Sequence, residues 1–338
     1  MSVRVLVVDD SAFARKVLRE SLLTHPQIEV IATARDGIDA LEKIAELKPD
    51  VITLDLVMPS LDGLGVLAAL APEQRARVVV VSMADVESDL GVAALGFGVF
   101  DLVHKPTALA VASLHDIADE LVRKVLAAAD APSARASIEI SALRVPEDAR
   151  SDRVVLIGTS TGGPQALTKL LKALPADFPA PIAIVLHIPP GYTGPLAERL
   201  DSDCAIDVTE AREGLALRPG LAVLAQAGTH LRLAEAAGEI VLRLDSEPAT
   251  SIHRPAVDVL FESAAACLGP RALGVVLTGM GDDGLLGARA INAAGGRVLT
   301  EAEASCVVYG MPRAVKEAGL AVAEALLEDM PSAILARL

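Results

Sequence analysis

The sequence predicts an α/β fold with two doubly wound domains, each built on a parallel sheet, and with a β-hairpin inserted in the second domain. The chain has 338 residues, more than the roughly 100 to 200 residues of a usual domain. Short apolar runs alternate with helical patterns through both halves, and parallel strands need such crossover helices between them. Apolar residues make up 52% of the chain but aromatic residues only 2%. Ala, Val, Leu and Ile must therefore fill the cores, which suits close-packed α/β layers.

The first domain is expected over residues 1–129, where short apolar runs have the length and composition of buried parallel strands. These runs are Arg4–Asp9, Glu29–Ala34, Val51–Asp55, Val78–Ser82 and Asp101–Lys105. Over residues 130–152 the composition turns to Ala, Ser, Pro, Glu and Arg without sustained periodicity, which indicates a linker.

The second domain is expected over residues 153–338, where a new alternation of strands and helices begins. The predicted strands are Arg153–Gly158, Ile182–His187, Leu273–Gly279 and Arg297–Glu301, with helices after Gly162 and Gly284. Two further runs flank the turn region Gly238-Glu239 and are joined by too few residues for a crossover helix. These runs, Leu231–Leu233 and Ile240–Leu244, predict the inserted β-hairpin.

Composition also excludes several classes of partner. A formal net charge of -15 argues against a nucleic-acid surface, which needs a basic stripe to neutralise phosphates. Cys204, Cys267 and Cys306 are odd in number and lack metal-ligand spacing, which favours buried, reduced thiols in a cytoplasmic protein. The N-terminal apolar run ends in two carboxylates, unlike a signal peptide, and no segment approaches the ~18 apolar residues of a membrane span. We therefore expect a cytoplasmic protein that neither binds nucleic acid nor inserts into a membrane.

Three carboxylates are expected at one edge of the first sheet, because Asp9 and Asp10 end its first strand and Asp55 ends its third. Like charges so close together require a cation, and oxygen ligands of this kind suit Mg²⁺, which also neutralises phosphoryl oxygens. Ser82 and Lys105 end two further strands and add a hydroxyl and an ammonium to this edge. Any one of these residues alone could simply cap a helix, but together they predict a phosphoryl-binding site.

A second constellation lies in the other half of the chain. The motif Gly158-Thr159-Ser160-Thr161-Gly162-Gly163 follows a strand and opens a helix, which would place the Ser160 hydroxyl on a tight turn. Such turns more often bind phosphate or only turn the chain, so a nucleophile needs partners. His187 ends another strand of the same sheet and could act as the base. Asp282 and Asp283 follow a third strand, and residue chemistry alone leaves open which of them orients the imidazole.

The other histidines are weaker candidates for the base. His25, His104 and His115 lie in the first domain. His230 and His253 fall in predicted polar turns, where an isolated histidine is more often a plain hydrogen-bonding residue.

Three alternatives compete with a regulated serine hydrolase of specific substrate. Gly279, Gly281 and Gly284 spell G-x-G-x-x-G after a strand, and Glu301 ends the next strand, as in a dinucleotide site. Two carboxylates inside that turn would compete with a pyrophosphate for the helix N-terminus. A regulated esterase or peptidase for another acyl substrate is the second alternative, and a non-catalytic phospho-relay is the third.

The first domain resembles the response-regulator receiver family, which is flavodoxin-like. The resemblance is carried by Val8-Asp9-Asp10-Ser11, Leu54-Asp55-Leu56-Val57-Met58-Pro59, Asp62-Gly63 and Lys105-Pro106. It implies that Asp55 accepts a phosphoryl group from a histidine kinase. It also implies that Asp9, Asp10, Asp55 and the Val57 carbonyl hold Mg²⁺, and that Ser82 and Lys105 sense the phosphoryl group.

The second domain resembles the chemotaxis methylesterase family. The resemblance is carried by Gly158–Gly163, His187-Ile188-Pro189-Pro190-Gly191, His253-Arg254-Pro255-Ala256-Val257-Asp258, Leu277–Gly284 and Glu303–Pro312. It implies Ser160 as nucleophile, His187 as base and Asp283, not Asp282, as the orienting carboxylate, with backbone N–H groups near Met280 as candidates for the oxyanion site. Thr159 departs from the usual Ala, and Asp282 replaces a neutral or small residue.

Together the two resemblances imply a serine hydrolase in chemotaxis that needs no cofactor beyond the Mg²⁺ of the receiver. The expected reactions are hydrolysis of glutamate methyl esters and deamidation of glutamines on methyl-accepting chemoreceptors. The expected phosphodonor is the chemotaxis histidine kinase, and the unphosphorylated receiver is expected to cover the active site.

Overall fold

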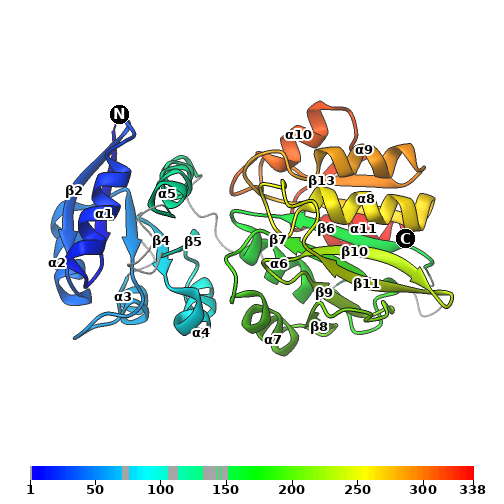
Figure 1. The fold of residues 1–338 in the computed structure, drawn as a ribbon, viewed down its shortest axis with the longest axis horizontal. Helices are drawn as coiled ribbons and strands as arrows, with labels where there is room; N and C mark the ends of the chain where they lie inside the picture. The colour runs from blue at the N-terminus through cyan, green and yellow to red at the C-terminus, as the bar shows by residue number, and fades with distance from the viewer. Residues whose placement is uncertain (1, 71–75, 106–112, 132–142, 144, 146–150) are drawn as a thin grey trace. The chain divides into compact units, whose positions relative to one another are not determined.

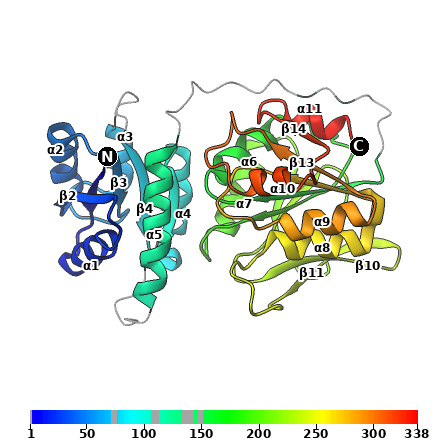
Figure 2. The same ribbon diagram turned by 90° about the horizontal axis from the view of Figure 1, so that it is seen from above.

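The computed structural model describes residues 2–70, 76–105, 113–131, 143, 145 and 151–338. The chain forms two compact units, Met1–Ala134 and Arg135–Leu338. Figures 1 and 2 show both units, with colour running from blue at the N-terminus to red at the C-terminus. Each unit is built on its own parallel sheet, as the alternating pattern predicts.

Within the described residues, the first unit contains a five-stranded parallel sheet with the order β2-β1-β3-β4-β5. The strands are β1 (Val3–Val8), β2 (Ile28–Ala34), β3 (Val51–Leu54), β4 (Arg77–Ser82) and β5 (Asp101–His104). The helices are α1 (Ala12–Leu22), α2 (Gly37–Leu47), α3 (Gly63–Ala69), α4 (Ala84–Gly96) and α5 (Ser113–Asp130). This order is that of flavodoxin-like folds, so the predicted fold class is confirmed for this unit.

The inner strands of this sheet are buried on both faces, as parallel strands between helix layers must be. The runs Val5–Val8, Val51–Leu54 and Val78–Val81 are all at most 7% exposed. Helix α1 packs on α5, while α2 packs on α3 and α3 on α4, and these helices flank the sheet (Figure 2). The carboxyl edge of the sheet is left for the loops that carry the acidic residues.

The second unit contains a seven-stranded parallel sheet with the order β14-β13-β12-β6-β7-β9-β8 among its described residues. The strands are β6 (Val154–Thr159), β7 (Ile182–Leu186), β8 (Asp207–Glu210), β9 (Leu221–Leu224), β12 (Ala272–Val276), β13 (Arg297–Glu301) and β14 (Ala323–Ala325). The helices are α6 (Gly163–Lys172), α7 (Thr193–Asp203), α8 (Val257–Leu268), α9 (Leu285–Ala293), α10 (Met311–Glu317) and α11 (Met330–Leu335), with a 3₁₀ turn η1 (Gly269–Arg271).

The predicted hairpin is present and longer than predicted. Strands β10 (His230–Ala236) and β11 (Glu239–Asp245) form an antiparallel pair of their own. Ala237 and Gly238 connect them with φ angles of 52° and 83°, the left-handed pair that a two-residue hairpin turn requires. The hairpin packs on helix α8, as the yellow-green strands beside that helix show (Figure 1).

Three strands of the second sheet were not predicted. Strand β9 is a four-residue apolar run, Leu-Ala-Val-Leu, which periodicity cannot distinguish from a piece of buried helix. Strand β8 contains two acidic residues, and β14 is the three-residue segment Ala-Glu-Ala, which lacks β-branched side chains. Both β8 and β14 lie at the edges of the sheet. Each is a strand because it pairs with its one neighbour, and not because its residues have a high β-propensity.

The predicted linker over residues 130–152 lies mostly outside the described residues, so the division at residues 129 and 152 stays a prediction. Among its described residues, Asp130 ends helix α5, and the N–H of Leu143 donates to the carbonyl of Ala173 at 2.9 Å. No helix within the described ranges combines the length and the hydropathy needed to cross a membrane. All three cysteines are free thiols; Cys306 is buried as expected, whereas Cys204 and Cys267 are only half-buried.

Candidate active site and phosphoacceptor site

The second unit places Ser160, His187 and the Asp282-Asp283 pair in the loops that follow three adjacent strands, β6, β7 and β12. Strand β6 lies between the other two, so the sheet order reverses there, at the kind of switch point where parallel sheets bind ligands. Strands β6 and β7 end at the pair Thr159↔Leu186, and the N–H of His187 donates to the Thr159 carbonyl at 3.1 Å. Ser160 and His187 therefore both follow directly after a matched pair of strand ends.

Ser160 lies in a tight turn between β6 and α6. Its N–H donates to the Thr278 carbonyl at 3.1 Å, and its carbonyl accepts from the Gly163 N–H at 2.7 Å. Gly162 has a φ of 80°, in the left-handed region that glycine tolerates, and a Cβ there would lie 2.6 Å from Cβ of Val307. The turn leaves Ser160 half-buried at the positive N-terminal end of α6.

His187 is held by Asp283, and the contact fixes which ring nitrogen carries a proton. Nε2 of His187 lies 2.8 Å from Oδ2 of Asp283. Because an ionised carboxylate only accepts hydrogen bonds, Nε2 carries the proton and Nδ1 keeps the lone pair. Nδ1 is buried and has no hydrogen-bond partner among the described residues. The imidazole, whose side chain is 9% exposed, therefore presents one unused acceptor nitrogen.

Asp283 is also bound by the first amides of helix α8. Its Oδ2 accepts from the Val257 N–H at 2.7 Å, and its Oδ1 accepts from the Asp258 N–H at 2.9 Å. Burial alone would raise the pKa of Asp283, but His187 and these amides outweigh it and hold the pKa below its usual range. Asp282 is exposed. The structure thus brings Asp283, and not its neighbour, against His187.

Met280 follows a glycine that lies against the nucleophile turn. A Cβ on Gly279 would lie 3.0 Å from Cβ of Ser160 and 2.3 Å from the sulfur of Met311. The Gly279 carbonyl accepts from the N–H groups of Gly310 and Met311 at 3.1 and 2.9 Å. Because the N–H of a trans peptide points opposite to its C=O, the Met280 N–H points away from the loop that holds Gly310 and Met311.

Behind this turn lies a buried polar network centred on Thr278, which is 1% exposed. Its carbonyl accepts from the Thr159 hydroxyl at 2.7 Å, so the hydroxyl that Thr159 brings to this position is satisfied. Its own hydroxyl lies 3.0 Å from the Thr161 carbonyl and accepts from the N–H groups of Val307 and Val308. The network ties the nucleophile turn to the segment before α10.

Glu301 belongs to the same network and excludes the dinucleotide alternative. It is 0% exposed, its Oε2 accepts from the Thr278 N–H at 2.8 Å, and its Oε1 accepts from the Ser305 hydroxyl at 2.9 Å. Burial raises the pKa of this carboxyl. A side chain so enclosed cannot reach a ribose hydroxyl, and Asp283 already occupies the turn where a pyrophosphate would bind.

Two histidines assigned to polar turns have more specific places. The ring of His253 stacks on that of His187, with centroids 4.0 Å apart and an interplanar angle of 18°. His230 begins strand β10 and is 0% exposed; its Nδ1 accepts from the N–H of Ala256, the residue before α8, at 3.2 Å. The one signal in the sequence for either position is that His253 and Asp258 belong to the same motif.

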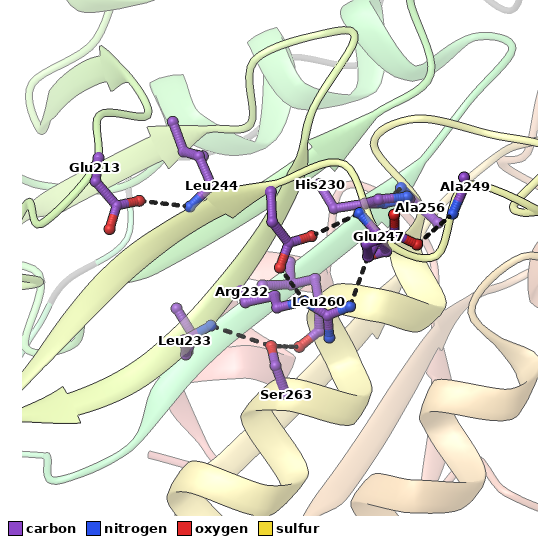
Figure 3. A network of polar contacts seen from close by, with 11 residues as sticks. Glu213, His230, Arg232, Leu233, Leu244, Glu247, Ala249, Ala256, Leu260 and Ser263 are labelled. Carbon is purple, nitrogen blue, oxygen red and sulfur yellow. Dashed lines mark hydrogen bonds and ion pairs between the residues drawn. The ribbon is translucent and has the colours of Figure 1, made fainter.

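Figure 3 shows how the hairpin supports the start of helix α8. Arg232 of β10 binds the Asp245 carboxylate at 2.8 Å and the Glu247 carbonyl at 2.7 Å. The Leu233 N–H donates to the hydroxyl of Ser263, on α8, at 3.1 Å. The Arg232 contacts hold one end of the segment between β11 and α8, and the contact of His230 with Ala256 holds the other. This segment carries His253.

The first unit brings together the predicted acidic residues. Carboxylate oxygens of Asp9, Asp10 and Asp55 lie within 4.8 Å of one another at the ends of β1 and β3. Nζ of Lys105 lies 2.7 Å from Oδ2 of Asp9 and 2.6 Å from Oδ2 of Asp55. Burial alone would lower the pKa of Lys105, but hydrogen bonds and charges of the two carboxylates outweigh it and raise the pKa. Such a set of oxygens fits a hard divalent cation.

Ser82 and Val57 lie around the same edge. Ser82 ends β4 at 1% exposure, and its carbonyl accepts from the Lys105 N–H at 2.8 Å. Val57 follows Asp55 by two residues in the loop after β3 and is 50% exposed. A Cβ on Gly63 would lie 2.5 Å from the Asp55 carbonyl, so the start of α3 can approach this loop only with glycine there. Pro106, after Lys105, lies outside the described residues.

Two family models match the chain. The model described as CheB methylesterase matches residues 155–334. The model described as response regulator receiver domain matches residues 5–117. Each match covers the unit whose motifs carry the corresponding resemblance.

Curated proteins and a solved structure are similar over long stretches. Protein-glutamate methylesterase/protein-glutamine glutaminase 5 of Myxococcus xanthus is 60% identical over 334 residues, which cover 97% of this chain and 96% of that protein. The protein-glutamate methylesterase/protein-glutamine glutaminase of Geobacillus kaustophilus is 43% identical over 347 residues, covering 98% of each. The crystal structure of the Thermotoga maritima CheB methylesterase catalytic domain matches with a TM-score of 0.54 and 39% identity, covering 56% of this chain and all of that one.

Proposed function

The chain belongs to the CheB methylesterase family, and from this premise we propose how its residues carry out and regulate the reaction. It is a protein-glutamate methylesterase and protein-glutamine glutaminase with a receiver domain. Its substrates are glutamate methyl esters and glutamine amides of chemoreceptors. The residues proposed to act on them are Ser160 as nucleophile, His187 as base and Asp283 as the orienting carboxylate.

In the first step Oγ of Ser160 attacks the carbonyl carbon of the ester, and its proton passes to Nδ1 of His187. Asp283 accepts the Nε2 hydrogen bond and stabilises the imidazolium. Backbone N–H groups near Met280 stabilise the oxyanion of the tetrahedral intermediate. The intermediate collapses as Nδ1–H protonates the methoxy oxygen, the C–O bond breaks, and methanol leaves the acylated Ser160.

A water molecule then attacks the acyl carbon, with Nδ1 of His187 taking its proton and returning it to Oγ of Ser160. The products are the free glutamate side chain and the regenerated enzyme. A glutamine side chain follows the same course with ammonia as the leaving group. The observation that carries this proposal is the unused, buried Nδ1 of an imidazole whose other nitrogen is bound to Asp283.

We further propose that Asp55 accepts a phosphoryl group from a phosphohistidine of the chemotaxis histidine kinase. Asp9, Asp10, Asp55 and the Val57 carbonyl would hold Mg²⁺, and the clustered carboxylate oxygens support this assignment. When bound, the ion neutralises the phosphoryl oxygens during transfer. Lys105, which already contacts Asp55, and the Ser82 hydroxyl then bind the phosphoryl group.

The chemoreceptors are proposed to be methyl-accepting ones, whose side chains the enzyme reaches from the cytoplasm. The three free thiols suit a reducing compartment. Phosphorylation of the receiver is proposed to activate the hydrolase.

The experiment measures methanol release from membranes that contain methylated chemoreceptor, with Mg²⁺ and acetyl phosphate present. The native protein should release methanol, Ser160→Ala should not, and a fluorophosphonate should label the native protein once, at Ser160. A small activated ester serves as the comparison substrate. Hydrolysis of that ester without release of receptor methanol would favour an esterase for another acyl substrate.

A further inference from the structure

Helices α8 and α9 lie side by side (Figures 1 and 2), and neither has a side-chain cap of its own. The residue at the N-cap of α8 is Ala256, and the one at the N-cap of α9 is Gly284; neither makes a side-chain cap hydrogen bond. The first N–H groups of a helix have no partner within the helix. Two sets of buried donors therefore need acceptors from elsewhere in the chain.

Each helix receives its cap from the other. Asp283, just before α9, accepts from the first two amides of α8, Val257 and Asp258, at 2.7 and 2.9 Å. Asp258, in the first turn of α8, accepts from the amides of Gly284 and Gly287 at 2.9 and 2.8 Å, both on its Oδ1. The caps are thus exchanged: Asp283 accepts from the N-terminal amides of α8, and Asp258 accepts from the N-terminal amides of α9.

Close packing makes this exchange possible. A Cβ on Gly287 would lie 2.4 Å from Cβ of Phe261 and 3.1 Å from the Asp258 Cα. Only a residue without a side chain lets α9 approach α8 closely enough for one carboxylate oxygen to reach two amides. The contact with Asp258 of α8 therefore fixes the N-terminus of α9, and with it the position of Asp283.

We propose that Asp258 is a positioning residue for the catalytic triad: by holding the start of α9 it fixes the carboxylate of Asp283 against His187. The proposal rests on the proposed function, in which Asp283 orients the base. Asp258 touches neither Ser160 nor the imidazole through any hydrogen bond of the described residues, so it acts through Asp283.

The electrostatic environments of the two carboxylates support this division of roles. Burial, together with the nearby charges of Asp283 and Glu262, raises the pKa of Asp258 to about 6 against the lowering effect of the Gly287 and Gly284 amides. The pKa of Asp283 is instead held below its usual range. When two neighbouring carboxyls are pushed apart in this way, one keeps the charge and the other takes the first proton. Asp283 is the one that stays charged beside the imidazole.

The first test compares steady-state kinetics of substituted full-length proteins on methylated receptor membranes. Asp258→Ala removes both hydrogen bonds, and Asp258→Glu keeps the charge but displaces the oxygen by one methylene. Each should lower kcat by roughly 10- to 100-fold, as for displaced catalytic groups, with KM unchanged, because orientation of the base acts in the chemical steps. Asp258→Asn keeps an oxygen acceptor and should stay within about 3-fold of the native kcat.

The matched control is Asp201→Ala. The Asp201 carboxylate also accepts from a backbone amide of the same unit, that of Val208 at 2.7 Å, but it lies on helix α7 and contacts no triad residue. Its removal should leave kcat unchanged at temperatures where circular dichroism shows the protein folded. A native kcat in both the Ala and the Glu variants of Asp258 would overturn the proposal.

The second test is a double-mutant cycle with Asp283→Ala. If Asp258 acts through Asp283, the double variant should be as active as Asp283→Ala alone, because effects within one functional unit are not additive. Independent, multiplying losses would mean that Asp258 does not act through Asp283. An Asp283→Ala protein with native kcat would instead refute the triad assignment itself, so the two failures are distinguishable.

Discussion

Nε2 of His187 lies 2.8 Å from Oδ2 of Asp283, so the nitrogen that faces the serine in the proposed reaction is Nδ1. This arrangement uses the two ring nitrogens in the opposite sense to the chymotrypsin-type triad, in which the aspartate binds Nδ1. The roles proposed for Ser160, His187 and Asp283 are nevertheless those of that triad: nucleophile, base and orienting carboxylate. Asp283 holds the imidazole of His187, and the first two amides of helix α8 hold the carboxylate of Asp283.

The first prediction separates the two adjacent carboxylates. Asp283→Asn should lower kcat by up to ~10⁴, the loss that the equivalent change causes in a serine protease. Asparagine has no charge to stabilise the imidazolium, and it offers one acceptor oxygen where Asp283 offers two to its three donors. Asp282→Asn should change kcat little, because Asp282 is exposed. Methanol release at saturating receptor measures both, and equal losses would remove Asp283 from the triad.

The second prediction concerns His253, whose ring stacks on that of His187. His253→Ala removes the ring that limits rotation of the imidazole, and kcat should fall by about 10-fold, as for a catalytic group that loses its support. His253→Phe keeps a flat ring at the same place and should recover most of the activity. The rate of Ser160 labelling by a fluorophosphonate should follow the same order; a Phe variant as impaired as the Ala variant would contradict a stacking role.

The third prediction is a pH dependence of stability. The pKa of Asp258 rises from 3.8 to about 6 on folding, so the folded chain binds this proton more tightly than the unfolded chain does. Its contribution is favourable below pH 3.8 and is lost as the pH rises towards about 6. Relative to Asp258→Asn, the native protein should therefore lose melting temperature across this window and then hold a constant difference. Calorimetry at several pH values measures the difference, and a parallel pair of curves would contradict the raised pKa.

The fourth prediction concerns regulation. Incubation with Mg²⁺ and acetyl phosphate should add one phosphoryl group to the native protein and none to Asp55→Asn, as measured by intact-protein mass. Methanol release should rise with phosphorylation in the native protein only. Asp62→Asn provides a control, since the Asp62 carboxylate caps helix α3 through the Gly65 amide at 2.7 Å. Phosphate retained by Asp55→Asn would show that another residue is the acceptor.

The strand ends were predictable from the sequence, and with them most of the two sites. Val8 and Leu54 are paired across β1 and β3, so the carboxylates that follow them meet at one edge, as strand-end reasoning requires. Thr159 and Leu186 play the same part for Ser160 and His187. In a parallel sheet, residues that follow the carboxyl ends of neighbouring strands lie together at one edge, so recognising the strand ends is enough to predict which residues meet.

Features that depend on contacts between distant loops were not predictable in this way. The sequence alone does not distinguish Asp282 from Asp283. What distinguishes them is that Asp283 accepts from the amides of Val257 and Asp258, in the first turn of helix α8. The stacking of His253 and the burial of Glu301 likewise arise from tertiary packing. The edge strands β8 and β14 escaped prediction because pairing, and not composition, makes them strands.

The exchanged caps have a consequence for partly folded chains. The Asp283 carboxylate meets all its donors only when β7, β12 and α8 are docked together, because the donors belong to His187, Val257 and Asp258. A chain in which α8 has detached leaves the Asp283 carboxylate without two of these three donors. In the proposed mechanism, hydrolytic activity therefore depends on the docking of α8 onto the sheet, and not on the formation of the sheet alone.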